Sequence, residues 1–293
     1  MGKEVRGSGF FEMNMNIPNI TEQVKALAIE VGAFIRKQRE EFQPDKVIMK
    51  SSHDYVSYVD KEAEARIVAG LKKIMPDAGF VTEEGTSVAT RDQRAIMEEG
   101  KEYCWVVDPL DGTTNFIHGM APYCVCIALR TSTEAIVGVV YEVVNDELFW
   151  AYKGGGAYCN DKPIKASSTE SLTQALLVLG LPYDVKRYKE FYKHLSGALY
   201  GNVASIRNLG SAEAELCYVA CGRIDAYVEP CIYPWDVCAG SIIIQEAGGK
   251  ISDFSGGNDL WEQGREVLAT NGKIHSELLS AVIASKTAVN ASF

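Results

Sequence analysis

The sequence feature that most constrains the fold is a short apolar run that ends at two carboxylates. The run 105–107 stops at Asp108, and Asp111 follows three positions later. Pro109 disfavours a helical conformation at the preceding residue, so Asp108 should leave a buried strand in an extended conformation. Gly112 permits a sharp bend, after which two threonines can cap a helix whose amide N–H groups face the strand end. Carboxylates bind hard cations, and the amides at a helix N-terminus bind phosphate. Their combination in one short segment indicates metal-dependent chemistry on a phosphate ester.

Predicted helices and strands are interleaved along the chain. Apolar residues at helical spacing predict a first helix with Thr21 as a plausible cap, and the strand patterns include a hairpin around Asn145 and Asp146. Interleaving with hairpins favours a layered α/β or α+β architecture with mixed sheets over a uniform βαβ fold. The predicted helices are 20–42, 61–75, 184–200, 211–222 and 237–247, and the predicted strands are 79–82, 124–129, 135–141, 147–152, 176–179 and 224–229.

The composition is that of an acidic globular protein. The 293 residues are 47% hydrophobic and 23% charged, with a formal net charge of −10, and they suffice for one large domain or two coupled ones. The negative charge argues against nucleic acid as a partner, because binding to a phosphate backbone needs a basic surface. A small anionic substrate stays compatible with it, since bound divalent cations invert the local field.

The sequence contains no pattern that predicts export or membrane insertion. No stretch is long and apolar enough to span a bilayer, and residues 1–19 lack the basic-then-apolar pattern of a signal peptide. The eight cysteines form no C-x-x-C pair, which indicates reduced thiols in a cytosolic protein. We therefore expect a cytoplasmic protein with an N-terminal extension and with a polar connection or short exposed helix at 86–102.

Further carboxylates lie at predicted strand ends and helix starts. Asp60 ends an alternating run that should be a strand or an extended segment before the second helix. Glu83 and Glu84 follow a short apolar strand, and Asp236 directly precedes a buried helix. At such places side chains from different elements can converge. Because no His or Cys joins the pattern, the donors are all oxygen, which suits Mg²⁺, with Mn²⁺ or Ca²⁺ as competitors, and not a structural zinc ion.

Simpler roles stay open for several of these residues. Asp236 alone is more simply explained as a helix cap, and Asp60 could be a helix N-cap. Glu84 is better explained as a solvated neighbour of Glu83. A structural role is harder to find for the two carboxylates after the 105–107 run, because they repel each other unless a cation lies between them.

Three segments together resemble the inositol monophosphatase family of Mg²⁺-dependent phosphatases: Asp108–Phe116, Glu83-Glu84 upstream and Trp235-Asp236 downstream. The resemblance runs from residue 20 to residue 280, approximately. It implies the layered α-β-α-β-α sandwich shared with fructose-1,6-bisphosphatase, lithium sensitivity and a homodimer. The implied organisation is an extension at 1–19, an N-terminal α+β half at 20–165 with most metal ligands, and a C-terminal α/β half at 166–285 that completes the active site.

The resemblance also implies a set of metal ligands. Glu83, Asp108 and the Leu110 carbonyl match a first metal site, and Asp108, Asp111 and Asp236 match a second. A third, weaker ion would lie near Glu83 and be held mostly by water. Two to three Mg²⁺ ions are therefore expected, with Mn²⁺ as a substitute.

Catalytic and substrate-facing positions follow from the same resemblance. Asp60 and Thr113 match the pair that orients and activates the nucleophilic water, with Glu83 beside them and with Asp54 as a less favoured base. The backbone of Gly112 and Thr113 would hold the phosphate. The chain departs from the family pattern on both sides of its Glu-Glu pair and in a longer 86–102 connection. The positions that match the wall facing the substrate alcohol are Asp111, Gly210, Ser211, Ala212, Glu229 and Asp236.

The favoured function is Mg²⁺-dependent hydrolysis of myo-inositol monophosphate to inositol and phosphate by activated water. Glu229 could accept hydrogen bonds from the hydroxyls of a polyol, which favours inositol, but it is equally well explained as a carboxylate at a strand end. Another substrate stays open: a sugar bisphosphate, a 3′-phosphonucleotide or a lipid-linked inositol phosphate. The alternative from a different functional class is a non-catalytic regulator that binds metal or phosphate.

Overall fold

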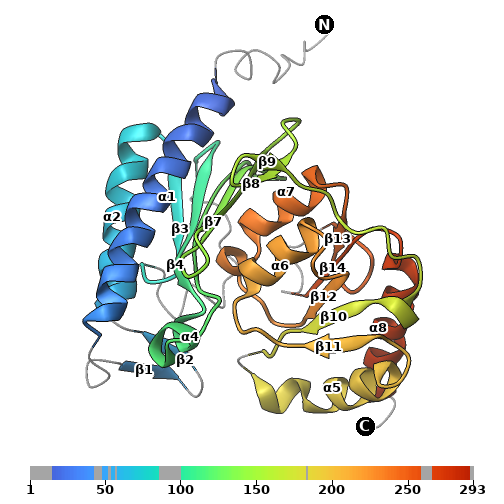
Figure 1. Cartoon of the computed structure of the whole chain (residues 1–293). Helices are drawn as coiled ribbons and strands as arrows, with labels where there is room; N and C mark the ends of the chain where they lie inside the picture. The colour runs from blue at the N-terminus through green and yellow to red at the C-terminus, as the bar shows by residue number, and fades with distance from the viewer. Residues whose placement is uncertain are drawn as a thin grey trace, which may run out of the picture.

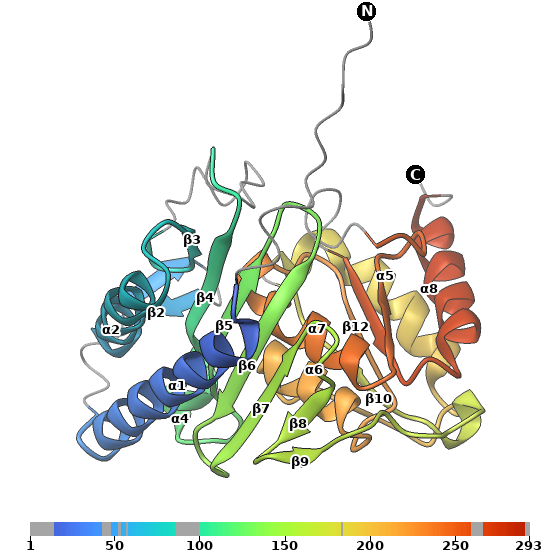
Figure 2. The ribbon, with the colours of Figure 1, turned by 90° about the horizontal axis from the view of Figure 1, so that it is seen from above.

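The chain folds into alternating layers of helix and sheet (Figures 1 and 2). The computed structural model describes residues 15–42, 48–51, 54–56, 58–85, 100–182, 184–258 and 266–290. The expected α-β-α-β-α sandwich is confirmed. In order, its layers are α1 (Ile17–Glu40) with α2 (Tyr58–Ile74), a seven-stranded sheet, α6 (Ala212–Ala220) with α7 (Cys238–Glu246), a five-stranded sheet, and α5 (Val185–Leu199) with α8 (His275–Asn290).

Helix α1 begins three residues before the predicted start, and Thr21 is not its cap. The side chain of Asn16 caps the helix by accepting a hydrogen bond from the Asn19 N–H at 3.1 Å. Pro18 sits in the first turn, where its missing N–H has no helical partner to lose. The Thr21 hydroxyl donates instead to the Ile17 carbonyl at 2.9 Å.

Helix α2 corrects the prediction of a strand that runs to Asp60. The short strand β2 (Asp54–Val56), which pairs with β1 (Ile48–Ser51), ends early, and α2 starts at Tyr58. Asp60 is therefore buried in the first turn of a helix. The alternating pattern concealed a helical stripe that extends back before Asp60 and faces the core, made of Val59, Ala63, Ile67 and Leu71.

The seven-stranded sheet is buried on both faces in its centre. Its strands follow chain order, β3 and β4 are parallel, and the remaining pairs are antiparallel. Along β4, Trp105 and Val107 pack toward α1 and α2, while Cys104 and Val106 pack toward α6 and α7. The strands are β3 (Gly79–Thr82), β4 (Cys104–Asp111), β5 (Cys124–Arg130), β6 (Ala135–Glu142), β7 (Glu147–Tyr152), β8 (Ala157–Cys159) and β9 (Lys162–Pro163).

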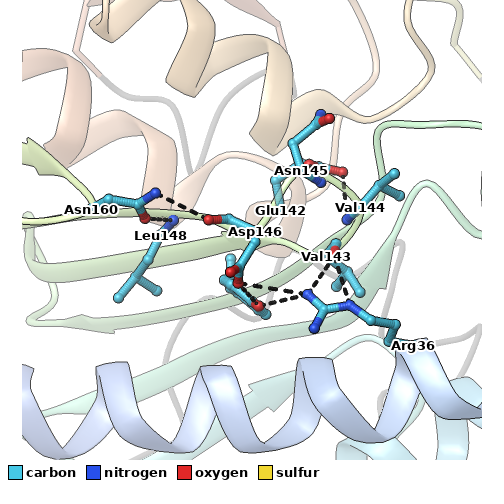
Figure 3. Close-up of polar contacts among 9 residues, drawn as sticks. Arg36, Glu142, Val143, Val144, Asn145, Asp146, Leu148 and Asn160 are labelled. Atoms are coloured by element: carbon cyan, nitrogen blue, oxygen red, sulfur yellow. Dashed lines mark hydrogen bonds and ion pairs between the residues drawn. The ribbon is translucent and has the colours of Figure 1, made fainter.

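The predicted β6–β7 hairpin is confirmed and is tied to α1 (Figure 3). Glu142 accepts hydrogen bonds from two turn amides, Val144 N–H at 3.1 Å and Asn145 N–H at 2.6 Å. From α1, Arg36 donates to the Val143 carbonyl at 2.8 Å and forms an ion pair with Asp146 at 3.6 Å. These contacts fix the first helix layer against the sheet.

The five-stranded sheet is mixed, as the interleaved pattern predicted. Its order is β11-β10-β12-β14-β13, with β10 parallel to β11 and β12, and β14 antiparallel to both neighbours. Its strands β11, β13 and β14 were not predicted, because their apolar patterns are short. The helix α8, which packs beside this sheet, was not predicted either, because its apolar pattern is weakly periodic. The strands are β10 (Leu176–Leu179), β11 (Ser205–Arg207), β12 (Ala226–Glu229), β13 (Lys250–Ser252) and β14 (Val267–Thr270).

None of the helices in the described residues has the length and apolar character that crossing a membrane requires. Most of the 86–102 connection, including any short exposed helix in it, lies outside the described residues. The remaining short elements are α4 (Thr113–His118) and the 3₁₀ turns η3 (Leu172–Gln174) and η4 (Pro234–Asp236).

Replacing Gly138 by Ala should destabilise the contact between β6 and α7. An added Cβ would lie 2.5 Å from the Ala239 carbonyl oxygen and 2.6 Å from Ile242 Cγ2. Such overpacking costs about 1–3 kcal/mol of unfolding free energy, to be measured by urea denaturation. Gly197→Ala in α5 is the control, because no atom lies within 4 Å of the added Cβ, and it should be neutral or stabilising by about 0.5–1 kcal/mol. Equal unfolding free energies for the two variants would contradict this packing.

Candidate active site

Strand β4 delivers two carboxylates because its pairing with β5 is interrupted. The register shifts between Asp108 and Asp111, where Pro109 has no N–H to donate to the partner strand. The Asp108 Oδ1 atom accepts a hydrogen bond from the Leu110 N–H at 2.8 Å. Both aspartates are buried, and the strand continues past Asp108, where we expected it to end, to Asp111.

Gly112 turns the chain so that Thr113 reaches Asp60. Its φ is +90°, and a Cβ there would lie 3.0 Å from the Pro122 carbonyl oxygen, so glycine is required. The Thr113 Oγ1 atom lies 2.9 Å from Asp60 Oδ1 and 3.0 Å from the Leu110 carbonyl oxygen. Thr113 is the first residue of α4 and does not cap it, contrary to the predicted role of the threonines. The predicted pairing of Asp60 with Thr113 is present in the structure.

The start of α6 holds Asp111 from the other side of the cleft. Asp111 Oδ2 accepts hydrogen bonds from Ser211 Oγ at 2.6 Å and from the Glu213 N–H at 2.8 Å. Its Oδ1 accepts one from the Ala212 N–H at 3.2 Å. Helix N-termini stabilise negative charge through such unpaired amides. Asp111 therefore joins the first sheet to the central helix layer.

Asp236 and Glu83 reach the same region from two turns. Asp236 ends η4, and its Oδ2 accepts a hydrogen bond from the Tyr233 N–H at 3.0 Å. It does not cap α7, so the simpler explanation as a cap of that helix is wrong. Glu83 follows β3 and is buried, while the adjacent Glu84 N–H donates to Glu64 Oε2 at 2.7 Å.

A cleft of about 610 Å³ brings the predicted site residues together. Asp60 does not line it and lies behind Thr113, with 0% of its surface exposed. Asp54, the less favoured base, has a side chain outside those that the structure describes. Every other predicted ligand, catalytic or alcohol-facing residue lines the cleft: Glu83, Asp108, Leu110, Asp111, Gly112, Thr113, Gly210, Ser211, Ala212, Glu229 and Asp236.

The electrostatics of the cleft favour a bound cation. Burial raises the pKa of Asp108 well above its usual range, and the charges of Glu83, Asp111 and Asp236 raise it further. Burial, Asp111 and Glu83 likewise raise the pKa of Asp236. A cation would reverse these shifts, and the donors are all oxygen, as Mg²⁺ prefers. In the described part of the chain, no three acidic, His or Cys side chains form a metal cage.

Glu229 and Glu215 line the wall of the cleft that the C-terminal elements form. Burial raises the pKa of Glu229 to about 7, and the Tyr227 hydroxyl donates to its Oε2. Glu215 accepts hydrogen bonds from the Leu209 N–H at 2.5 Å and the Gly210 N–H at 3.3 Å, and burial raises its pKa to about 8. Glu215 thus holds the loop that precedes α6.

The sequence interpretation missed several residues that shape the cleft. Glu213 and Glu215 are both buried although they lie in a predicted helix. Glu215 stands between Ala214 and an apolar run that starts at Leu216, and this pattern could have predicted its burial. Charged residues are seldom fully buried without partners, so such a residue indicates a specific contact. Asn115, which donates to the Leu209 carbonyl at 2.7 Å, gave no comparable signal.

The chain belongs to the inositol monophosphatase family, whose sequence profile matches residues 17–287. It is 37% identical over 243 residues to the Nus factor SuhB of Vibrio cholerae, a match that covers 83% of this chain and 88% of that protein. It is 37% identical to the inositol-1-monophosphatase of Mesorhizobium japonicum, covering 87% of this chain and 92% of that one.

A solved structure supports the fold. The inositol monophosphatase of Anabaena (Nostoc) sp. PCC 7120 superposes with a TM-score of 0.80 at 33% identity, covering 92% of this chain and 97% of that one. The resemblance inferred from three short segments is therefore confirmed across the chain. Membership of this family supports phosphatase activity.

Without metal, the protein should lose stability as the pH rises from about 4.5 to about 8. The folded-state pKa of Glu229 is about 7 and that of Glu215 is about 8, against 4.5 ordinarily. The folded state therefore keeps protons that the unfolded state has released, so stability is full below pH 4.5 and falls until both groups ionise. Chemical denaturation with chelator present measures this fall. Glu215→Gln should make the fall smaller, and an unchanged slope in that variant would contradict the burial of Glu215.

Proposed function

We propose that the protein is a Mg²⁺-dependent phosphomonoesterase whose main substrate is myo-inositol monophosphate. The observation that carries the proposal is the convergence of Glu83, Asp108, Asp111 and Asp236 on one cleft beside the Asp60–Thr113 pair. The name of the Mesorhizobium relative, inositol-1-monophosphatase, supports this substrate.

In this proposal the acidic residues hold two or three metal ions. Glu83, Asp108 and the Leu110 carbonyl bind the first, and Asp108, Asp111 and Asp236 bind the second, with a weaker third ion near Glu83. The Thr113 hydroxyl has a single proton, so when it donates to Asp60 the Leu110 carbonyl, 3.0 Å away, keeps both lone pairs for this role. When bound, Mg²⁺ or Mn²⁺ supplies charge neutralisation at the phosphate and increases the acidity of water.

Thr113 and Asp60 provide the path for a proton. The Thr113 hydroxyl is placed to donate to Asp60, which leaves its oxygen free to accept a proton from the attacking water. The water oxygen forms a bond to phosphorus, the ester P–O bond breaks, and the released alcohol oxygen takes up a proton. Hydrolysis is direct, with no phosphoenzyme, and the Gly112 and Thr113 backbone holds the phosphate.

The side of the cleft formed by Asp111 and by the C-terminal elements faces the substrate alcohol. Glu229 is its main polar group and contributes hydrogen bonds to polyol hydroxyls; with a pKa of about 7, it can donate or accept near neutral pH. The other contributors are Asp111, Gly210, Ser211, Ala212 and Asp236, all of which line the cleft.

A larger, partly apolar alcohol is the second candidate substrate. A second cavity of about 400 Å³ shares Leu181, Pro182 and Val185 with the cleft and continues to Lys189. Leu181 is 66% exposed and Val185 is 50% exposed. This apolar rim favours a 3′-phosphonucleotide or a lipid-linked inositol phosphate over a sugar bisphosphate.

Other expectations belong to the same proposal. A homodimer and inhibition by lithium are proposed from the family resemblance, and a cytoplasmic location from the free cysteines. The net charge of −10 argues against nucleic acid as a partner. The Vibrio relative is named Nus factor SuhB. A non-catalytic regulator is therefore the alternative function.

A phosphate-release panel tests the proposal. With Mg²⁺, the protein should release phosphate fastest from myo-inositol monophosphate, and chelator should abolish release. Asp108→Asn should lower the rate by at least about 10²-fold, because it removes charge from a ligand that two ions share. Faster release from aryl phosphates or nucleotides would favour the second candidate. No release from any monoester, in protein that binds Mg²⁺, would support the regulator.

Replacing Asp60 by Asn should separate catalysis from metal binding. Because Asp60 lies behind Thr113 and outside the cleft lining, we expect kcat to fall by about 10²–10⁴-fold while the Mg²⁺ concentration for half-maximal rate stays nearly unchanged. Steady-state kinetics at several Mg²⁺ concentrations measure both. If the main effect is a higher Mg²⁺ requirement, Asp60 is a metal ligand instead.

A further inference from the structure

One buried carboxylate outside the proposed ligand set joins the two helices of the central layer. Glu213 is the second residue of α6, and 0% of its surface is exposed. Its Oε1 accepts a hydrogen bond from the Ala239 N–H at 3.0 Å, and its Oε2 accepts one from the Gly240 N–H at 2.5 Å. Both amides lie in the first turn of α7, which has no cap from its own Val237 side chain. Glu213 therefore caps α7 from the neighbouring helix.

The same residue also contacts a proposed metal ligand. The Glu213 N–H donates to Asp111 Oδ2 at 2.8 Å. Asp236 lies two residues before the first residue of α7, so the position of that helix start decides where Asp236 enters the cleft. Through its backbone and its side chain, Glu213 thus connects two carboxylates that are distant in the sequence.

The packing around Glu213 lets its carboxylate approach the backbone of Gly240 closely. A Cβ at position 240 would lie 2.6 Å from Glu213 Oε2 and 2.7 Å from Leu216 Cβ. Only glycine at Gly240 lets the carboxylate reach the helix amides at hydrogen-bond distance.

We propose that Glu213 is a positioning residue for the metal site. The inference rests on the proposed function, since it concerns the Mg²⁺ affinity of that same cleft. Glu213 fixes the start of α7 relative to Asp111 and so sets the separation of Asp111 from Asp236. Without its carboxylate, two buried α7 amides lose their acceptor, and the helix start must shift to find another.

The other end of α7 offers a matched control. Glu246, the last residue of the helix, accepts hydrogen bonds from the Gly154 N–H and the Gly156 N–H, both at 2.8 Å. It is again one carboxylate that holds two backbone amides, but it does not line the cleft. Loss of this contact loosens α7 without changing the separation of Asp111 from Asp236.

Calorimetric titration of the full chain with MgCl₂ tests the proposal directly. Glu213→Ala should weaken Mg²⁺ binding by about 10–100-fold, the range for residues that orient metal ligands. Glu213→Gln keeps one acceptor oxygen and should bind with intermediate affinity. Glu246→Ala should bind Mg²⁺ like the wild-type protein. If Glu213→Ala does not fold, the Mg²⁺ affinities of Glu213→Gln and Glu246→Gln are compared instead.

Each other outcome has a distinct meaning. Wild-type affinity in Glu213→Ala overturns the inference and leaves the proposed function standing. Equal weakening in Glu213→Ala and Glu213→Gln overturns it in favour of a purely electrostatic effect of the carboxylate on Asp111. Equal weakening in Glu246→Ala overturns it in favour of general loosening of α7. If the wild-type protein binds no Mg²⁺, the result contradicts the proposed function itself.

Discussion

Mutual repulsion among buried carboxylates is the constraint on which the rest of the structure depends. Asp111 lies close enough to Asp108 and Asp236 to raise the pKa values of both, and burial alone already disfavours the charged forms of all three. The fold offsets this with donors: a hydroxyl and two amides hold Asp111, and one amide each holds Asp108 and Asp236. Hydrogen bonds to ionised carboxylates are stronger than those between neutral groups. We propose that a divalent cation completes the compensation.

The architecture explains why the cleft lies where it does. The central helices α6 and α7 separate the two sheets (Figure 1), and the first turn of α6 and the turn η4 before α7 reach β4. Asp111 comes from the first sheet, Asp236 from the turn before α7, and Asp60 from the outer helix α2. Layers distant in the sequence must therefore pack together before the site exists. A ligand bound there would stabilise the packed layers, since it binds only the folded state.

Much of the fold and of the site could be predicted from local pattern. The apolar run before Asp108, the hairpin around Asp146 and the buried helix before Gly248 have strong periodicity or turn signals, and the structure confirms each. The family resemblance supplied the candidate residues, and apart from Asp60 and the less favoured base Asp54 all of them line the cleft. The alternating run before Asp60 was misinterpreted, because its last residues also continue the helical stripe of α2.

Contacts between distant segments could be predicted only where the family resemblance supplied them, as for Asp60 and Thr113. Glu213 and Ala239 are 26 residues apart, and Asp111 and Ser211 are 100 apart. No local propensity encodes which helix amide a buried carboxylate meets, because that depends on how the layers pack. The strands β13 and β14 were missed for a related reason: each has only a few apolar residues, and the sheet around them supplies their stability.

Anomalous scattering from crystals grown with MnCl₂ tests the central claim most directly. The account predicts manganese peaks in the cleft, within bonding distance of the oxygens of Asp108 and of at least two among Glu83, Asp111 and Asp236. Data from crystals grown without the metal would then lack those peaks. Manganese bound elsewhere on the surface, with these carboxylates keeping only their protein hydrogen bonds, would contradict the account.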